Sequence, residues 1–254
     1  MARQCIFCPR PADSKEHLWS GWILEVFKSR PELQQPIRFS KDKTTARWID
    51  NPEVLISCVC QSCNNGWMSD LEIQNRPQML PMLLDQRTTL GPQQQKSLAR
   101  WAILKGMVLE AANRERDSFY NNEERSAFKP PLSSIPVATT VWIGRFSGIG
   151  FHAGGTGIFR PLENVPKAIH GHVTTIVIAH LAIQVLTAHV LPMFADRGRI
   201  SLGQNPGKWD MSLLECWPIF GSVRWPPPIS FTPKGANSIG RLVFRWKVGT
   251  DISK

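Results

Sequence analysis

The sequence lacks an uninterrupted apolar segment long enough to cross a lipid bilayer. Its most apolar stretch, residues 173–193, is broken by His180, Gln184 and His189. A transmembrane helix needs about 20 mostly apolar residues, so these polar interruptions favour buried strands instead. The first residues also lack the basic and then apolar pattern of a signal peptide. We therefore expect a protein without a membrane span that resides in the cytoplasm.

Two motifs of nucleotide chemistry are missing as well. The glycines between residues 148 and 157 match neither G-x-G-x-x-G nor a phosphate loop that ends in Gly-Lys-Ser/Thr, and they predict β-turns. A zinc-dependent nucleobase deaminase needs His-x-Glu and a proline before its cysteine pair. Neither occurs in this sequence. Nucleotide binding through a glycine-rich loop and base deamination are therefore excluded.

The positive charge is unevenly distributed along the chain. The formal net charge is +10, yet residues 1–75 contain nine Lys+Arg and nine Asp+Glu, so the whole excess lies in residues 76–254. A basic surface favours polyanions such as DNA, because neutralised phosphates release their counterions. Basic residues scattered over the surface would give the same net charge. Charge alone does not identify the partner.

Four of the six cysteines form two C-x2-C pairs, Cys5/Cys8 and Cys60/Cys63. In a reducing compartment, such pairs indicate metal binding rather than disulfides. Four thiolates complete the tetrahedral shell of one zinc ion, so we expect a structural zinc that has no open position for a substrate water. Cys58 and Cys216 remain, and Cys58 is an alternative to Cys60 as a ligand. The 51 residues between Cys8 and Cys60 must hold structure of their own.

Hydrophobic periodicity predicts several elements. Residues 18–27 form a short helix or a buried turn, and residues 44–60 form two strands around a turn at 50–52. A helix starts within residues 66–73, where Ser69 and Glu72 have the spacing of a capping box. The clearest helix covers residues 93–116, and Lys105 is the one charged residue on its apolar stripe.

A break rich in proline and serine at residues 129–136 precedes β-like segments at 137–146, 157–159, 173–190 and 229–231. The later histidines lack ligand spacing with carboxylates and are expected in the core or on the surface. The predicted fold class is α+β. It combines a small zinc-stapled module at residues 1–75 with a larger basic α+β domain at residues 76–254.

Two short strings lie next to the cysteine pairs, Ser-Lys-Glu-His at residues 14–17 and Cys-Asn-Asn-Gly-Trp-Met at residues 63–68. Together with the cysteines they resemble the HNH, or ββα-metal, endonuclease family in its four-cysteine form. The resemblance covers about residues 1–75. It implies a metal-dependent endonuclease that hydrolyses phosphodiester bonds in DNA.

The resemblance also implies roles for individual residues. Glu16 and Asn64 would hold one Mg²⁺ or Mn²⁺ ion, for which oxygen ligands are suited. His17 would be the general base that activates a water, and Asn51 would orient its imidazole. The metal would stabilise the charge on the leaving 3′-oxygen. Zinc bound to the four cysteines would hold the loops in register.

Some features of the pattern leave alternatives open. Asn51 lies nine residues before Cys60, a longer spacing than the family uses, and Asn65 competes with Asn64 for the metal. Trp67 lies three residues after Asn64, at a position where members of the family often have Lys or Arg. Two other functions fit the same residues. One is a non-catalytic protein that uses the zinc module as a scaffold for nucleic-acid binding, and the other is a defence or toxin-type nuclease effector that a partner activates.

Overall fold

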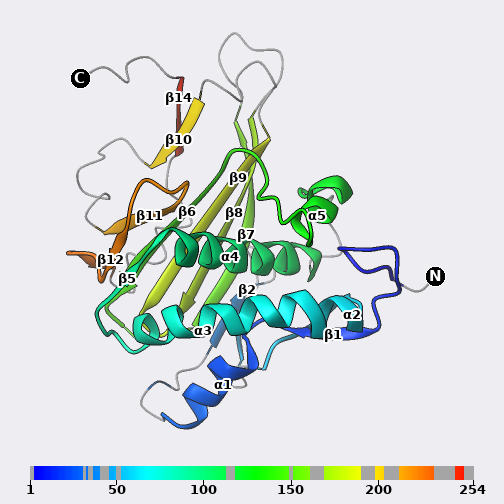
Figure 1. The fold of residues 1–254 in the computed structure, drawn as a ribbon, viewed down its shortest axis with the longest axis horizontal. Coiled ribbons are helices and arrows are strands. Elements are labelled where there is room, and N and C mark those ends of the chain that lie inside the picture. Colours follow the sequence, from blue (N-terminus) through cyan, green and yellow to red (C-terminus); the bar gives the residue numbers. More distant parts are fainter. Residues whose placement is uncertain are drawn as a thin grey trace.

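The computed structural model describes residues 3–30, 33, 37–40, 46–49, 53–112, 118–148, 151–160, 169–189, 198–202, 212–231 and 244–248. A small unit near the N-terminus combines two strands and a helix (Figure 1). Strands β1 (Ser14–His17) and β4 (Leu55–Val59) pair in antiparallel orientation, with Glu16 opposite Ile56. Directly after β4 the chain runs through α2 (Gln61–Cys63), the π-helical segment η2 (Asn64–Met68) and α3 (Ser69–Leu83). The order is strand, strand, helix.

A larger sheet of eight strands forms the second layer (Figure 1). Its spatial order is β11 (Leu213–Trp217), β6 (Thr139–Phe146), β9 (Leu181–His189), β8 (Ile169–Ile178), β7 (Phe151–Arg160), β2 (Ile37–Ser40) and β3 (Ala46–Ile49), and β13 (Ser230–Phe231) pairs with β6. Neighbours are antiparallel except for the parallel pairs β2–β7 and β6–β13. Two small sheets pair β5 (Thr88–Leu90) with β12 (Val223–Trp225) and β10 (Gly198–Leu202) with β14 (Phe244–Val248).

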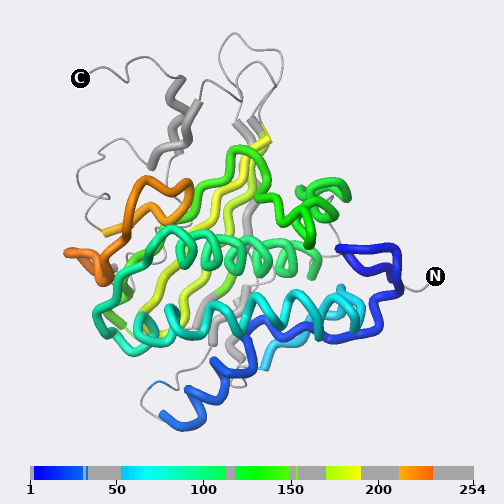
Figure 2. Tube along the Cα trace, viewed as in Figure 1, coloured from blue at the N-terminus to red at the C-terminus, as the bar shows by residue number. Residues whose placement is uncertain are grey.

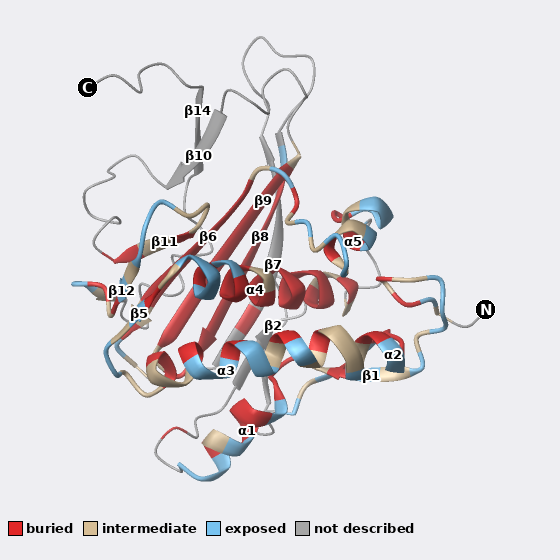
Figure 3. Ribbon diagram, viewed as in Figure 1, coloured by how far each residue is buried: buried red, intermediate tan, exposed pale blue. Residues whose placement is uncertain are grey.

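Helix α4 (Pro92–Ala112) lies between the two units. It packs against β7, β9 and β11 of the large sheet, and also against α3 and β4 of the N-terminal unit (Figure 1). Every residue from Leu98 to Leu109 except the half-buried Arg100 is therefore buried (Figure 3). Gly106 permits the close approach to β8, because an added Cβ would lie 2.8 Å from Oγ1 of Thr174. A helix that is covered on several sides explains why so few polar residues interrupt its sequence.

Two short helices complete the fold. Helix α1 (Gly21–Lys28) buries Trp22, Ile23 and Phe27, so the segment predicted as a helix or a buried turn is a helix. Helix α5 (Asn122–Phe128) starts at a capping box formed by Asn121 and Glu124.

The predicted α+β class is confirmed, and the predicted helix at 93–116 corresponds to α4. The predicted start of a helix within residues 66–73 is confirmed, because α3 begins at Ser69, beyond a kink at Gly66 (φ −97°, ψ −119°). The predicted capping box is wrong. Ser69 itself has helical angles (φ −60°, ψ −42°), and the preceding helical segment begins at Gln61 after Cys60, whose sulfur accepts a hydrogen bond from Cys63 N. Ser69 and Glu72 therefore form no capping box.

The division into two modules at residue 75 is not confirmed. That position falls inside α3, and β2 and β3, which lie between the cysteine pairs, belong to the large sheet. One hydrophobic cluster extends from Cys5 to Trp225. Figure 2 shows α3 lying alongside α4, and β4 also contacts α4.

Within the described part of the chain, no helix has the length and apolar character needed to cross a membrane.

Candidate functional site

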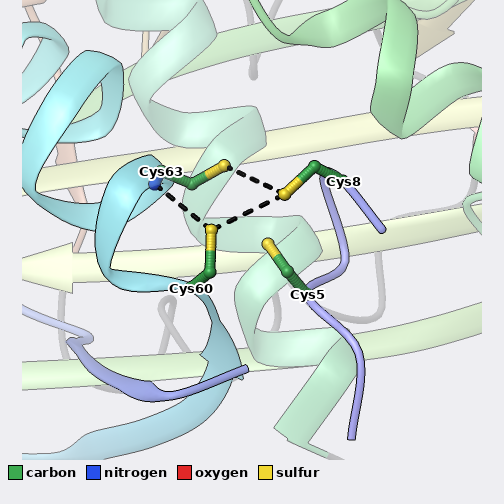
Figure 4. A group of neighbouring side chains, drawn as sticks. All are labelled: Cys5, Cys8, Cys60 and Cys63. Carbon is green, nitrogen blue, oxygen red and sulfur yellow. Dashed lines mark hydrogen bonds between the residues drawn. The ribbon is translucent and has the colours of Figure 1, made fainter. Parts of the chain in front are cut away.

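Four cysteines gather at one end of the N-terminal unit (Figure 4). Cys5 and Cys8 lie in the loop between the bridged residues Gln4 and Pro11, and Cys60 and Cys63 lie where β4 passes into α2. Their four sulfurs all lie within 4.8 Å of one another. The cluster can hold a metal ion such as zinc, as the two C-x2-C pairs predict.

The spacing of the sulfurs agrees with a tetrahedral zinc site. Cys8 Sγ lies 3.6 Å from Cys60 Sγ and 3.8 Å from Cys63 Sγ. Four sulfurs at about 2.3 Å from one zinc ion would be separated by about 3.8 Å. Backbone amides also point at the sulfurs, since Phe7 N donates to Cys5 Sγ at 3.5 Å and Cys63 N donates to Cys60 Sγ at 3.4 Å. Such donors stabilise thiolate charge, which a metal ligand carries.

The two remaining cysteines lie outside this cluster. Cys58 is fully buried on β4, and burial raises the pKa of its thiol to about 12. Cys216 is buried on β11, where its thiol faces Gln95 O at 3.5 Å, and burial raises its pKa to about 12. The alternative in which Cys58 replaces Cys60 is therefore wrong, and both leftover cysteines are core residues.

Strand β1 is tied to the helix that follows the second cysteine pair. Asp13 Oδ1 accepts a hydrogen bond from Gln61 N at 2.8 Å and so caps α2. The side-chain amide of Asn64 donates to Ser14 Oγ at 2.8 Å and to Lys15 O at 3.2 Å. Asn64 therefore acts as a link between helix and strand. Its neighbour Asn65 is exposed.

Glu16 points from β1 into the interior. Its Oε1 lies 2.6 Å from Nζ of Lys105 on α4, and the Glu16 side chain is only 5% exposed. The same Nζ lies 2.6 Å from Oε1 of Glu72 on α3 and donates to His17 O at 2.9 Å. Burial disfavours the charged lysine, but the two carboxylates outweigh this effect and raise the pKa of Lys105. Glu16 is thus half of a buried carboxylate pair that shares one ammonium group.

His17 follows Glu16 but points the other way, toward solvent. Its Nε2 lies 3.2 Å from Oε1 of Glu53, and the two side chains are 43% and 51% exposed. Successive residues of a strand face opposite sides, which explains why adjacent residues have such different surroundings. The imidazole is accessible and is held by a carboxylate.

The three side chains that the resemblance assigns to one site each have a different partner. Glu16 turns to Lys105, His17 to Glu53, and Asn64 to Ser14 and Lys15. The predicted pairing of Glu16 with Asn64 around a divalent ion does not fit these contacts, because an ammonium group already lies against Glu16. Asn51 lies outside the described residues, so its predicted role stays a prediction.

Three residues of this region were not predicted as site residues. Lys105 had a signal in the sequence, since it is the one charge on an apolar helical stripe. The only signal for Glu72 in the sequence was its proximity to the second cysteine pair, and Glu53 had no signal. Their partners come from other elements, so spacing along the chain could not reveal them.

Part of the basic character of residues 76–254 is neutralised by carboxylates. Lys105 pairs with two carboxylates, Arg125 with Glu110, and Arg145 with Asp85. Arg100 is half-buried over the ring of Phe128. These residues contribute little free charge to a surface that could bind DNA.

The later histidines surround a different side chain, Phe119. The rings of Phe119 and His189 stack with centroids 4.1 Å apart, and His170 and His172 also contact Phe119. His189 Nε2 lies 2.8 Å from Glu124 Oε1 at the edge of a pocket of about 370 Å³. His172 is buried and His170 is exposed, as expected for histidines of the core and surface.

Comparison of the chain with protein-family models, with curated proteins and with solved structures gave no match.

Proposed function

We propose that this protein is a zinc-stapled endonuclease that hydrolyses phosphodiester bonds in DNA, with His17 as the general base. The observation that carries the proposal is the accessible imidazole of His17, hydrogen-bonded to Glu53 at 3.2 Å at the end of β1. Two further features support it. The strand, strand, helix order of β1, β4 and α2–α3 is the order that the ββα-metal resemblance implies, and the four cysteines lie beside it.

The pair of His17 and Glu53 is suited to general-base chemistry. Because Nε2 faces the carboxylate, Nδ1 keeps the free lone pair and can take a proton from water. The water oxygen forms a bond to phosphorus, the bond from phosphorus to the 3′-oxygen breaks, and the leaving oxygen takes a proton from solvent. Glu53 stabilises the imidazolium that results.

The contacts in the structure fit one of the two ions that the resemblance implies, the structural zinc, better than the other. The four thiolates suit a structural Zn²⁺, which would fix the loop that carries Cys5 and Cys8 against the start of α2. We assign no ligands to a catalytic Mg²⁺ or Mn²⁺ ion, because Glu16, the carboxylate that the resemblance assigns to it, is paired with Lys105. No step of the proposal depends on that ion.

A plasmid cleavage assay tests the proposal. Supercoiled DNA is incubated with the zinc-loaded protein with and without added Mg²⁺, and wild type is compared with His17→Ala and with the matched variant His170→Ala. His170 is an exposed histidine on the large sheet. We expect His17→Ala to cut at least about 100-fold more slowly and His170→Ala to cut like wild type. Equal cleavage by wild type and His17→Ala would overturn the assignment of His17.

A non-catalytic nucleic-acid-binding scaffold is the second candidate function. The burial of Glu16 against Lys105 favours it, because this contact removes the carboxylate that the resemblance assigns to a metal. A scaffold predicts retention of labelled DNA by wild type and His17→Ala alike, with no cleavage by either. The same preparations, run in a gel-shift assay, distinguish the two functions.

A further inference from the structure

Lys105 is a fully buried charge at the meeting point of three elements. It lies on α4, and its side chain is 1% exposed. Its ammonium group contacts Glu16 and His17 of β1 and Glu72 of α3. The residue thus joins the large central helix to both parts of the N-terminal unit.

The ammonium group has a complete set of partners. Its three N–H donors meet three oxygens, Glu16 Oε1 and Glu72 Oε1 at 2.6 Å and His17 O at 2.9 Å. Two of the acceptors belong to the adjacent residues Glu16 and His17 of β1, and the third belongs to Glu72 on α3. Two of the three are carboxylate oxygens aimed at one point. This is how protein oxygens surround a bound cation. The 2.6 Å distances lie at the upper end of the range of about 2.3 to 2.6 Å at which Ca²⁺ binds oxygen.

The charges agree with that description. Two carboxylates in a buried position repel each other strongly unless a cation lies between them. Glu16 is buried and Glu72 is 19% exposed, so water screens the pair only partly. Without Lys105, the carboxylates of Glu16 and Glu72 would face the same space with no positive charge between them.

We propose that Glu16 and Glu72 form a divalent-cation site that is closed in the native protein because the ammonium group of Lys105 occupies the position of the ion. Lys105 is then a built-in cation, and it also fixes the backbone of β1 through the carbonyl of His17. The part of this inference that concerns hydrolysis rests on the proposed function: cleavage at His17 would not use a metal ion bound to Glu16. The occupancy of the site by Lys105 does not depend on any activity.

Metal binding tests the inference directly. The full-length zinc-loaded chain is titrated with Mn²⁺ and followed by electron paramagnetic resonance and calorimetry. We expect wild type to bind no Mn²⁺ that depends on Glu72, and Lys105→Ala to gain one Mn²⁺ per chain. Lys105→Ala/Glu72→Gln should lose that ion again. The matched control is Lys96→Ala, which removes an exposed lysine from the same helix and should gain nothing.

Three results would overturn the inference. The first is a Mn²⁺ ion bound by wild type and lost in Glu72→Gln, which would mean that lysine and metal do not exclude each other. The second is a folded Lys105→Ala that binds no Mn²⁺. The third is a Lys105→Ala that stays unfolded both without and with Mn²⁺ or Ca²⁺, because a divalent ion should replace the missing charge and restore the circular dichroism of the fold.

The failure of this inference can be told apart from the failure of the proposed function. None of these readouts involves DNA, and His17→Ala leaves both carboxylates and Lys105 in place. His17→Ala/Lys105→Ala should therefore bind Mn²⁺ as Lys105→Ala does, whether or not the protein cleaves DNA.

Discussion

The sulfurs of Cys8 and Cys60 lie 3.6 Å apart, although the two residues are 52 positions apart in the sequence. No disulfide joins them, and two further sulfurs complete the group. A contact of this kind holds the N-terminal loop against the start of α2. It makes the cysteine cluster the part of the structure most directly open to chemical testing.

We expect one zinc ion per chain, measured by plasma mass spectrometry. Cys63→Ser should lose the ion, because the variant removes one of four thiolates, while Cys58→Ser should keep it. Loss of zinc should lower the Tm by more than about 10 °C, since structural zinc contributes folding free energy. A zinc-free Cys58→Ser, or a fully loaded Cys63→Ser, would contradict the ligand set.

Asn64→Asp separates two roles of Asn64. The aspartate keeps an oxygen ligand for a metal but cannot donate to Ser14 Oγ and Lys15 O. If Asn64 is a structural link, the variant loses about 1 to 2 kcal/mol of unfolding free energy in urea. The exposed neighbour provides the control, and Asn65→Asp should be close to neutral. Unchanged stability in Asn64→Asp would argue against the link.

Glu53→Gln should slow cleavage of plasmid DNA about tenfold while zinc content and Tm stay unchanged. The glutamine can still accept a hydrogen bond from His17, but it has no charge to stabilise the imidazolium. Both side chains are well exposed, so the loss should be smaller than for His17→Ala. A Glu53→Gln enzyme with the wild-type rate would remove Glu53 from the mechanism.

Gly106→Ala tests the contact between α4 and the large sheet. The added methyl group would lie 2.8 Å from Thr174 Oγ1, while its distance of 3.5 Å to the threonine Cβ is ordinary van der Waals contact. The buried threonine must therefore shift or rotate its hydroxyl, which also lies 3.4 Å from His172 Nδ1. Overpacking costs about 1 to 3 kcal/mol, which exceeds the gain of up to about 1 kcal/mol in helix propensity. We expect a net decrease in unfolding free energy. Gly21→Ala, where nothing lies within 4 Å of the new methyl group, should not be destabilised.

His172 predicts a pH dependence of stability. Burial, followed by the neighbouring His170, lowers its pKa from 6.5 to about 4. The unfolded chain therefore binds a proton below pH 6.5 that the folded chain binds only near pH 4, so stability falls as pH drops through this window. The difference reaches at most about 3 kcal/mol. In urea unfolding curves at pH 7 and pH 4.5, His172→Gln should lose less stability than wild type, and an equal loss would contradict the prediction.

Several features followed from the sequence alone because they depend on neighbouring residues. The spacing of Cys5, Cys8, Cys60 and Cys63 predicted the cluster, since each C-x2-C pair turns two sulfurs to one point. The apolar periodicity of residues 93–116 predicted α4. The β-like segments at 137–146 and 173–190 predicted β6 and most of β8 and β9, although 173–190 comprises two strands and not one.

Other features were decided only by the tertiary structure, because they depend on residues that meet from distant segments. The sequence set Glu16 and His17 side by side, but the pairing of β1 with β4 and the packing of α4 sent one to Lys105 and the other to Glu53. The insertion of β2 and β3 into the large sheet was likewise invisible in the chain. Local spacing determines which groups are available, while the burial of charge and the packing of helix on sheet determine which of them meet.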